Sequence, residues 1–363
     1  MNGKRRVAGA AILLAATVAT VGCSGGASER PAAKSDYSFP DLSGKSLVYA
    51  SYGGTLQEAE ENAFLLPFGE GSGLKVTTDG PVDEAKIKAQ VESGNVQWDM
   101  VNNEISFVSE QCGVLFEPLD TSIVTNLVSI DEQYKQSPCF LPTFAYSQLL
   151  MYNPDKYETP PSSWADFFDT EKFPGPRGAW MYDSANLITI ALLADGVPAD
   201  ELYPLDLDRA FKKLDTIKGE MRWAEAPGQV TEQILSDEVD MALVYSGRGY
   251  DAIAEGSPWK VAWDATPIVE VQGAAIVKGS KSTEAAQQLA NYMLSEEAQT
   301  NLPNFIAYSP IRSGVTPEVD DEKREFLMLD MPEGSTILGN PNPEWWKQNR
   351  DTVETRFTEW QAG

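Results

Sequence analysis

The sequence contains no histidine in 363 residues. A Ser-His-Asp triad, Cys-His catalysis and every histidine-ligated metal centre are therefore excluded. Lysine and arginine are also few, 28 against 54 acidic residues, which leaves a net charge of -26. Such a field repels nucleic acid and anionic lipid headgroups, so we expect no nucleic-acid partner. The charge identifies no ligand, because surface solvation or salt adaptation explains it as well.

A phosphate-binding loop and a strand-linked GxGxxG motif are also missing, and we expect no cofactor and no metal. Two classes stay open beside a binding protein. One is a secreted glycoside hydrolase, because a pair of carboxylates is sufficient for that chemistry. The other is a surface adhesion lipoprotein. The chain does contain 42% hydrophobic and 10% aromatic residues, which suits compact folding, and its length suits two lobes.

The N-terminus has the pattern of an export signal. Three basic residues at 4–6 precede an apolar run, Val7–Val21, that is short for a membrane span. Thr20-Val21-Gly22-Cys23 resembles a bacterial lipobox, so we predict a signal peptide at 1–22, lipidation of Cys23 and a flexible tether over 23–36. The protein would then be extracytoplasmic and held at the cell membrane by that lipid. Plain secretion after nearby cleavage is the alternative.

Two further cysteines, Cys112 and Cys139, remain in the mature chain. In an oxidising compartment an even pair is most simply a disulfide. Two thiols without any histidine make a poor metal site. We therefore predict a structural disulfide between them.

Beyond the tether, strand patterns and helix patterns alternate, which predicts an α/β fold with parallel sheets covered by helices. We expect two lobes, residues 37–145 with 271–320 and residues 146–270, with the chain crossing between them twice. The helical segment 321–363 is not assigned to either lobe. Predicted strands lie at 47–51, 74–78, 98–101, 146–152, 241–245 and 274–277, and predicted helices at 55–66, 82–93, 185–218 (broken at 196–198), 230–235 and 283–294.

Several stretches, in this order and spacing, resemble the extracellular solute-binding proteins of the spermidine/putrescine type. The resemblance covers about residues 45–315 and implies the type II periplasmic-binding fold: two α/β lobes joined by hinge crossovers, with a ligand cleft between them. It also implies an ABC-transporter membrane permease as partner and a binding protein, not an enzyme; we expect a monomer. The stretches are 51–54 (SYGG), 98–101 (WDMV), 113–120 (GVLFEPLD), 151–156 (MYNPDK), 163–169 (SWADFFD), 172–178 (KFPGPRG), 239–248 (VDMALVYSGR) and 276–280 (IVKGS).

Residues that follow predicted strands are candidates for ligand contact, because ligands of parallel α/β sheets bind outside the carboxyl ends of the strands. Tyr52, Gly53 and Gly54 follow the first strand, where the glycines allow close backbone approach and the next helix offers free N–H groups to a carboxylate. A plain βα turn is the alternative. Trp98 and Asp99 offer an aromatic face and a carboxylate to an ammonium group. A core tryptophan beside a surface aspartate is the alternative.

Arg248 follows the strand that ends at Tyr245, in a loop of small residues, and a guanidinium there can grip a carboxylate with two hydrogen bonds. The resemblance places an arginine here in the cleft; an interlobe salt bridge is the alternative. Polyamine-binding members commonly carry an acid where this chain has Gln272, two residues after Glu270. This departure favours an ω-amino acid such as γ-aminobutyrate over a long polyamine. Second-lobe residues that could add walls and amide contacts, or equally serve in the core or at the surface, are Trp180, Tyr182, Trp223 and Gln229.

Overall fold

The computed structural model describes residues 37–327 and 342–363. Asp36–Gly363 forms one compact unit. The predicted signal peptide, Cys23 and the tether lie outside the described residues. Within the described ranges, no helix combines the length and apolarity that crossing a bilayer requires.

All eleven strands of the described residues belong to one sheet. They are β1 (Ser46–Ala50), β2 (Lys75–Asp79), β3 (Met100–Glu104), β4 (Phe116–Glu117), β5 (Leu141–Tyr152), β6 (Arg177–Trp180), β7 (Met221–Ala224), β8 (Met241–Tyr245), β9 (Lys260–Val261), β10 (Ile268–Val277) and β11 (Ser309–Pro310). The main order is β2-β1-β3-β10-β5-β8-β6-β7. Strands β1, β2 and β3 are mutually parallel, and so are β6, β7 and β8. The alternation of strands and helices therefore gives two parallel halves, as the sequence predicts.

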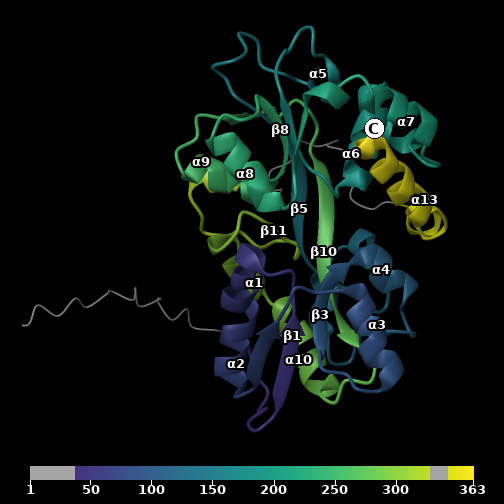
Figure 1. Ribbon diagram of the computed structural model, residues 1–363. Helices are drawn as coiled ribbons and strands as arrows, with labels where there is room; N and C mark the ends of the chain where they lie inside the picture. The colour runs from purple at the N-terminus through teal and green to yellow at the C-terminus, as the bar shows by residue number, and fades with distance from the viewer. Residues whose placement is uncertain (1–36, 328–341) are drawn as a thin grey trace, which may run out of the picture. The chain divides into compact units, whose positions relative to one another are not determined.

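The two long strands β5 and β10 join these halves as an antiparallel pair (Figure 1). Their register shifts between Gln272 and Gly273, opposite Pro142 of β5. Proline cannot donate a ladder hydrogen bond, and a bulge accommodates it. Gly273 is required there, because a Cβ atom would lie 2.2 Å from the carbonyl oxygen of Leu141. The pairing of β5 with β10 is thus interrupted by a bulge near the middle of the two strands.

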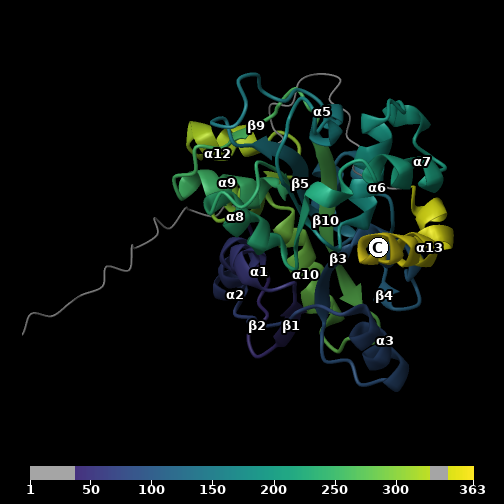
Figure 2. The same cartoon turned by 45° about the horizontal axis from the view of Figure 1, so that its top comes forward.

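Helices cover both faces of the sheet. Figures 1 and 2 show α8 and α9 on one side of the central strands and α6, α7 and α13 on the other. The helices are α1 (Gly54–Glu60), α2 (Leu66–Ser72), α3 (Glu84–Ser93), α4 (Ile105–Glu110), α5 (Trp164–Phe168), α6 (Ser184–Ala194), α7 (Leu207–Leu214), α8 (Pro227–Leu235), α9 (Ser246–Ala254), α10 (Thr283–Met293), α11 (Glu296–Asn301), α12 (Asp321–Phe326) and α13 (Pro343–Ala362), with a π-helical segment at Glu61–Leu65 and 3₁₀ turns at Thr125–Ser129, Glu132–Tyr134, Ala199–Glu201, Lys218–Glu220 and Leu302–Asn304.

The buried apolar side chains divide the unit into two lobes. One core contains side chains from Leu42–Ala145 and Val269–Ile311, and we call the elements around it the first lobe. Two adjoining cores draw mainly on Leu149–Ile268 and define the second lobe. Burial of this much apolar surface is the main force that holds each lobe together.

The C-terminal segment packs against the second lobe. Phe326 of α12 is buried in a second-lobe core. Trp346, Val353 and Phe357 of α13 are buried in the other second-lobe core. The described part of the segment 321–363, which the sequence does not assign to a lobe, therefore packs with the second lobe after β11, and the two crossings expected before it stay predictions.

Candidate functional site

The carboxyl ends of the parallel strands from both lobes meet at the middle of the β5–β10 pair. In the first lobe, Glu104 at the end of β3 is opposite Gln272 of β10. In the second lobe, Tyr245 at the end of β8 is opposite Gln148 of β5. Ligands of α/β sheets bind outside such strand ends. The candidate site therefore lies where the two lobes adjoin.

Two carboxylates, Asp183 and Glu270, lie together in this region. The side-chain amide nitrogen Nδ2 of Asn186 donates to both of them, at 2.9 Å from Oδ1 of Asp183 and 2.6 Å from Oε1 of Glu270. The Tyr146 hydroxyl donates to Oε2 of Glu270 at 2.9 Å, and Nε2 of Gln148 donates to Oδ2 of Asp183 at 3.1 Å. Strand β10 supplies one carboxylate, and the residue just before α6 supplies the other.

These carboxylates are held in an environment that disfavours their charge. Burial raises the pKa of Glu270 to about 7. Burial, with the nearby charge of Glu270, raises the pKa of Asp183 well above its usual range. Over residues 37–327 and 342–363, no lysine or arginine forms an ion pair with either group. A buried carboxylate without a cation is costly, so the pair is suited to an ammonium ligand.

Aromatic side chains form a continuous series beside the carboxylates. Ring centroids are 6.0 Å apart between Tyr182 and Trp180, 6.3 Å between Trp180 and Tyr245, and 5.3 Å between Tyr245 and Tyr146. Tyr146 also contacts Tyr308 at 5.3 Å. Tyr182 is 65% exposed, whereas Tyr308 is buried. Aromatic faces beside carboxylates attract organic cations.

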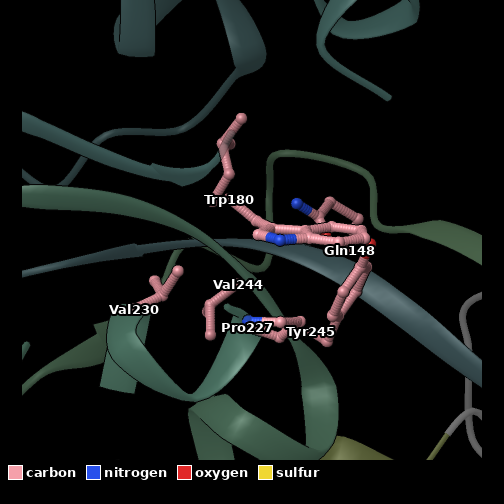
Figure 3. A pocket seen from close by; sticks show the side chains of 7 residues that line it. Gln148, Trp180, Pro227, Val230, Val244 and Tyr245 are labelled. Carbon is pink, nitrogen blue, oxygen red and sulfur yellow. The ribbon is translucent and has the colours of Figure 1, made fainter. Parts of the chain in front are cut away.

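A narrow recess lies against Trp180, with a cavity volume of about 10 Å³, close to the space that one water molecule needs. Figure 3 shows its indole lying across the recess, with Gln148 at one edge and Val244 and Pro227 on the opposite side. Among the described residues, neither Oε1 of Gln148 nor Nε1 of Trp180 has a hydrogen-bond partner, although both atoms are buried. A buried acceptor and a buried donor are thus free to bind a guest or a water molecule.

A hydrogen-bonded chain extends from the site into the first lobe. Nε2 of Gln272 donates to Oδ1 of Asn102 at 2.7 Å, and Nδ2 of Asn102 donates to Oε1 of Glu60 at 2.6 Å. The Tyr49 and Ser51 hydroxyls also donate to Glu60. Burial raises the pKa of Glu60 to about 7. These hydrogen bonds fix the Gln272 side chain from the first-lobe side.

Tyr52, Gly53 and Gly54 form the turn between β1 and α1, at the first-lobe side of the site. Both glycines have positive φ angles, 83° and 59°, which favour glycine. Tyr52 is 42% exposed, and the nearby Gln272 side chain opposes the desolvation that raises the pKa of its hydroxyl. The structure thus brings this predicted group together with Gln272.

Arg248 lies in the first turn of α9, so the predicted loop at this position is wrong. Its Nη1 is 3.4 Å from Oδ2 of Asp251, one helical turn further on. Burial raises the pKa of Tyr308 to about 12, and the positive charge of Arg248 opposes this rise. The guanidinium is therefore close enough to the aromatic series to act on it electrostatically. The guanidinium is about one quarter exposed. It therefore remains accessible beside the aromatic series.

Asp99 does not lie at the carboxyl end of a strand, so that part of the prediction is wrong. Strand β3 begins after it, and its carboxylate accepts hydrogen bonds from the Val48 amide at 2.8 Å and the Ser280 hydroxyl at 2.6 Å. Trp98 is 1% exposed, and its indole N–H donates to Asp79. The Asp99 carboxylate thus lies at the opposite end of the first-lobe strands from Glu104, whereas the Trp98 indole extends to Asp79, the last residue of β2; both side chains have partners within the first lobe.

Two second-lobe candidates also have structural partners. Trp223 packs edge-to-face against Phe357 and Trp360 of α13. Oε1 of Gln229 accepts from the backbone N–H groups of Glu225 and Ala226 at the start of α8. The structure does not bring Trp223 or Gln229 to the carboxylate pair, whereas it does bring Trp180 to Tyr245.

The predicted disulfide between Cys112 and Cys139 is confirmed, and it joins the segment after α4 to the start of β5. No group of three or more acidic or cysteine side chains suited to a metal occurs in the described part of the chain.

Sequence reasoning missed several residues of the site. Tyr146 and Gln148 carry a weak signal, since they alternate on one face of a predicted strand. Asp183 and Asn186 are three residues apart at the start of a helix, a spacing that places two side chains on one face. The missed residues are Glu104, Tyr146, Gln148, Asp183, Asn186, Tyr245 and Tyr308.

Two α/β lobes joined by two long strands, with polar and aromatic side chains gathered at the facing strand ends, define a ligand-binding protein. Residues 64–325 match the family model for bacterial extracellular solute-binding proteins. The chain belongs to this family, and its role is to bind a solute. The resemblance noted from the sequence is confirmed, as is the mixed α/β fold of the periplasmic-binding type.

Individual relatives cover most of the chain. A γ-aminobutyric acid-binding protein of Pseudomonas aeruginosa is 30% identical over 327 residues, which is 88% of this chain and 91% of the relative. The spermidine/putrescine-binding periplasmic protein 1 of Haemophilus influenzae is 24% identical, over 74% of this chain and 75% of its own. The solved structure of the Atu4243-GABA receptor is 35% identical, with a TM-score of 0.80, and the match covers 87% of this chain and 98% of that one.

Proposed function

We propose that this protein is the extracytoplasmic substrate-binding component of an ABC importer and that it captures a small amine-containing organic solute. The relatives support the amine, since their names state γ-aminobutyric acid or spermidine and putrescine. The single observation that carries the proposal is the pair of Asp183, which is buried, and Glu270, which is partly buried; the pair has no cation partner within the described residues and lies beside aromatic faces. An ammonium group would supply the missing charge.

An ω-amino acid such as γ-aminobutyrate fits the site better than a long polyamine. The guanidinium of Arg248 can pair with a carboxylate of the ligand, because it lies near Tyr308, at the opposite end of the aromatic series from Tyr182. Gln272 stands where an acid would serve a second ammonium group, and its amide is already bonded to Asn102. A ligand with one amine and one carboxylate therefore uses both kinds of group. Putrescine and spermidine are the alternative ligands.

Binding would act through movement of the two lobes about β5 and β10. The ligand contacts come from both lobes, so a bound solute stabilises their closed arrangement. A permease that recognises the closed form then receives loaded protein preferentially. The protein leaves its ligand chemically unchanged in this scheme, and neither the hydrolase nor the adhesion alternative is favoured. We further propose a monomer, tethered to the membrane by lipid on Cys23.

Calorimetric titration of the protein without its first 22 residues tests this function. The panel is γ-aminobutyrate, longer and shorter ω-amino acids, putrescine and spermidine. We expect saturable binding of at least one compound and thermal stabilisation without turnover, with about 2.7 kcal/mol gained at 100 times the dissociation constant. Absence of binding across the whole panel would contradict the amine ligand, and product formation would contradict a pure binding role.

A further inference from the structure

The C-terminal helix α13 is fixed to the second lobe along most of its length. Its buried side chains Trp346, Val353 and Phe357 belong to a second-lobe core. Polar contacts reinforce this attachment: the Trp346 indole N–H donates to the Tyr203 hydroxyl at 2.8 Å, and Nη2 of Arg356 lies 2.7 Å from Oδ1 of Asp208 on α7. When the lobes move, α13 must therefore travel with the second lobe.

One side chain of this helix reaches the first lobe. Nη2 of Arg350 donates to the Ser106 hydroxyl of α4 at 2.8 Å. Helices α13 and α4 are in contact, and Figure 1 shows them near each other on the side of α6. Because Ser106 lies only two residues after Glu104, this contact is close to the first-lobe edge of the site. It crosses from one lobe to the other.

The charged groups around Arg350 also favour its contact with Ser106 of the first lobe. Glu104 and Glu84 are exposed at the surface of the first lobe, and the positive charge of Arg350 lowers their pKa values against the partial desolvation that raises them. Both acids belong to the first lobe, at β3 and α3. On its own helix, Glu354 lies 3.8 Å from Nη1 of Arg350. Arg350 is thus attracted across the lobe boundary by two carboxylates, and it is about one third exposed.

We propose that the contact between Arg350 and Ser106 stabilises the arrangement in which the two lobes are together. Arg350 thereby raises ligand affinity, although it does not contact the ligand. A contact that exists only while the lobes are together adds to the free energy of the closed arrangement, and a ligand that binds this arrangement gains the same amount. Arg350 is a positioning residue in this sense, and its effect on affinity rests on the proposed function.

The test compares two arginines of the same helix. Arg350→Ala removes the contact between lobes, whereas Arg356→Ala removes an arginine–carboxylate contact within the second lobe. With γ-aminobutyrate and putrescine as probes, we expect Arg350→Ala to weaken calorimetric affinity by about 3- to 10-fold, mainly through faster dissociation. Arg356→Ala should leave it unchanged. Arg350→Lys should recover part of the loss, because it retains the charge near Glu84 and Glu104.

A double-mutant cycle with Ser106→Ala identifies the contact itself. If Arg350 acts through this hydroxyl, Ser106→Ala should cost affinity in the native protein and little more in the Arg350→Ala background. Equal affinity of the native protein and Arg350→Ala, or an equal loss in Arg356→Ala, would overturn the proposal.

Small-angle scattering of the ligand-free proteins separates this inference from the proposed function. We expect a larger radius of gyration for Arg350→Ala than for Arg356→Ala, because the lobes separate more often. If the native protein binds no amine, the proposed function fails, and the scattering comparison still decides the role of Arg350. Identical scattering of the two variants would overturn the role of Arg350, even if amines bind.

Discussion

The side-chain nitrogen Nδ2 of Asn186 donates hydrogen bonds to Oδ1 of Asp183 at 2.9 Å and to Oε1 of Glu270 at 2.6 Å. A single donor group therefore holds two carboxylates of different chain segments at one place. Like charges this close disfavour joint ionisation, so the empty pair retains a proton more readily than an isolated acid does. An arriving ammonium group would replace that proton and restore both charges.

Neutralising either acid should weaken amine binding without harming the fold. For Asp183→Asn and Glu270→Gln we expect a loss of affinity of roughly 30-fold or more, the cost of removing one partner of a buried charge pair. Ligand-free stability should be equal or higher, because a buried charge disappears. Calorimetry and thermal melts measure the two quantities. Asp195→Asn, which alters an exposed ion pair with Arg209, is the control; unchanged affinity in both site variants would refute the ammonium site.

Affinity and stability should respond to pH in opposite directions. Burial raises the pKa of Glu270 to about 7 and that of Asp183 above its usual range. Amine affinity should therefore fall as the pH drops from 8 to 6, because the carboxylates become neutral. The folded protein binds protons that the unfolded chain does not, so ligand-free stability should rise over the same interval.

The size of the stability change is set by linkage: each such group adds on the order of 1.4 kcal/mol per pH unit between its unfolded and folded pKa values. Calorimetry in buffers of different ionisation enthalpy should also show proton release on binding. In Glu270→Gln the pH dependence of affinity should flatten. Affinity that rises on acidification would contradict the assignment.

Local patterns predicted much of the fold correctly. The strands at 47–51, 74–78 and 241–245 agree with β1, β2 and β8 within a residue, and the helix at 283–294 agrees with α10. These segments have clear periodicity and short-range boundaries. The predicted strand at 146–152 covers only the second part of β5, because Pro142 argues against a strand, and the bulge that accommodates it, with Thr143 as the extra residue of β5, is not visible in the sequence pattern. The boundaries predicted for the two lobes stay predictions.

The site was less accessible to sequence reasoning. Asn186 and Glu270 are 84 residues apart, and only the crossing of β10 brings them together. Asp99 follows a tryptophan in a strand-like stretch, but β3 begins one residue later, which moves its carboxylate to the other end of the sheet. Gln229 has the composition of a ligand contact and acts as a helix cap. These outcomes depend on where strands and helices begin and on contacts between distant segments, which local periodicity does not fix.

The disulfide should make a large contribution to stability. It closes a loop with a sequence separation of 27 residues, and the chain-entropy model gives about 3–4 kcal/mol for a loop of this size. Cys112→Ala combined with Cys139→Ala should lower the free energy of unfolding by this amount, measured by urea denaturation. Amine affinity should change little, since the disulfide lies outside the site. Equal stability of the two proteins would show that the unfolded chain is not constrained by the bond.

Lipidation can be tested independently of binding. If Cys23 is the modified residue, intact mass spectrometry of protein from the membrane fraction should show a diacylglycerol or larger addition at a mature N-terminus that begins with Cys23. Cys23→Ser should shift the protein to the soluble extracytoplasmic fraction, with its amine affinity unchanged. A native protein that is already soluble and unmodified would support plain secretion instead.

Replacement of Arg248 should discriminate between the two ligand classes. A guanidinium pairs with a carboxylate through two hydrogen bonds, so Arg248→Ala should weaken γ-aminobutyrate binding by roughly 10- to 100-fold. Putrescine has no carboxylate and should bind as well as before, or slightly better because a positive charge is gone. Asp251→Asn serves as the control, because it removes the 3.4 Å partner of Arg248 and leaves the guanidinium in place. If Arg248→Ala weakens both ligands equally, the arginine supports the fold of α9 and does not select the carboxylate.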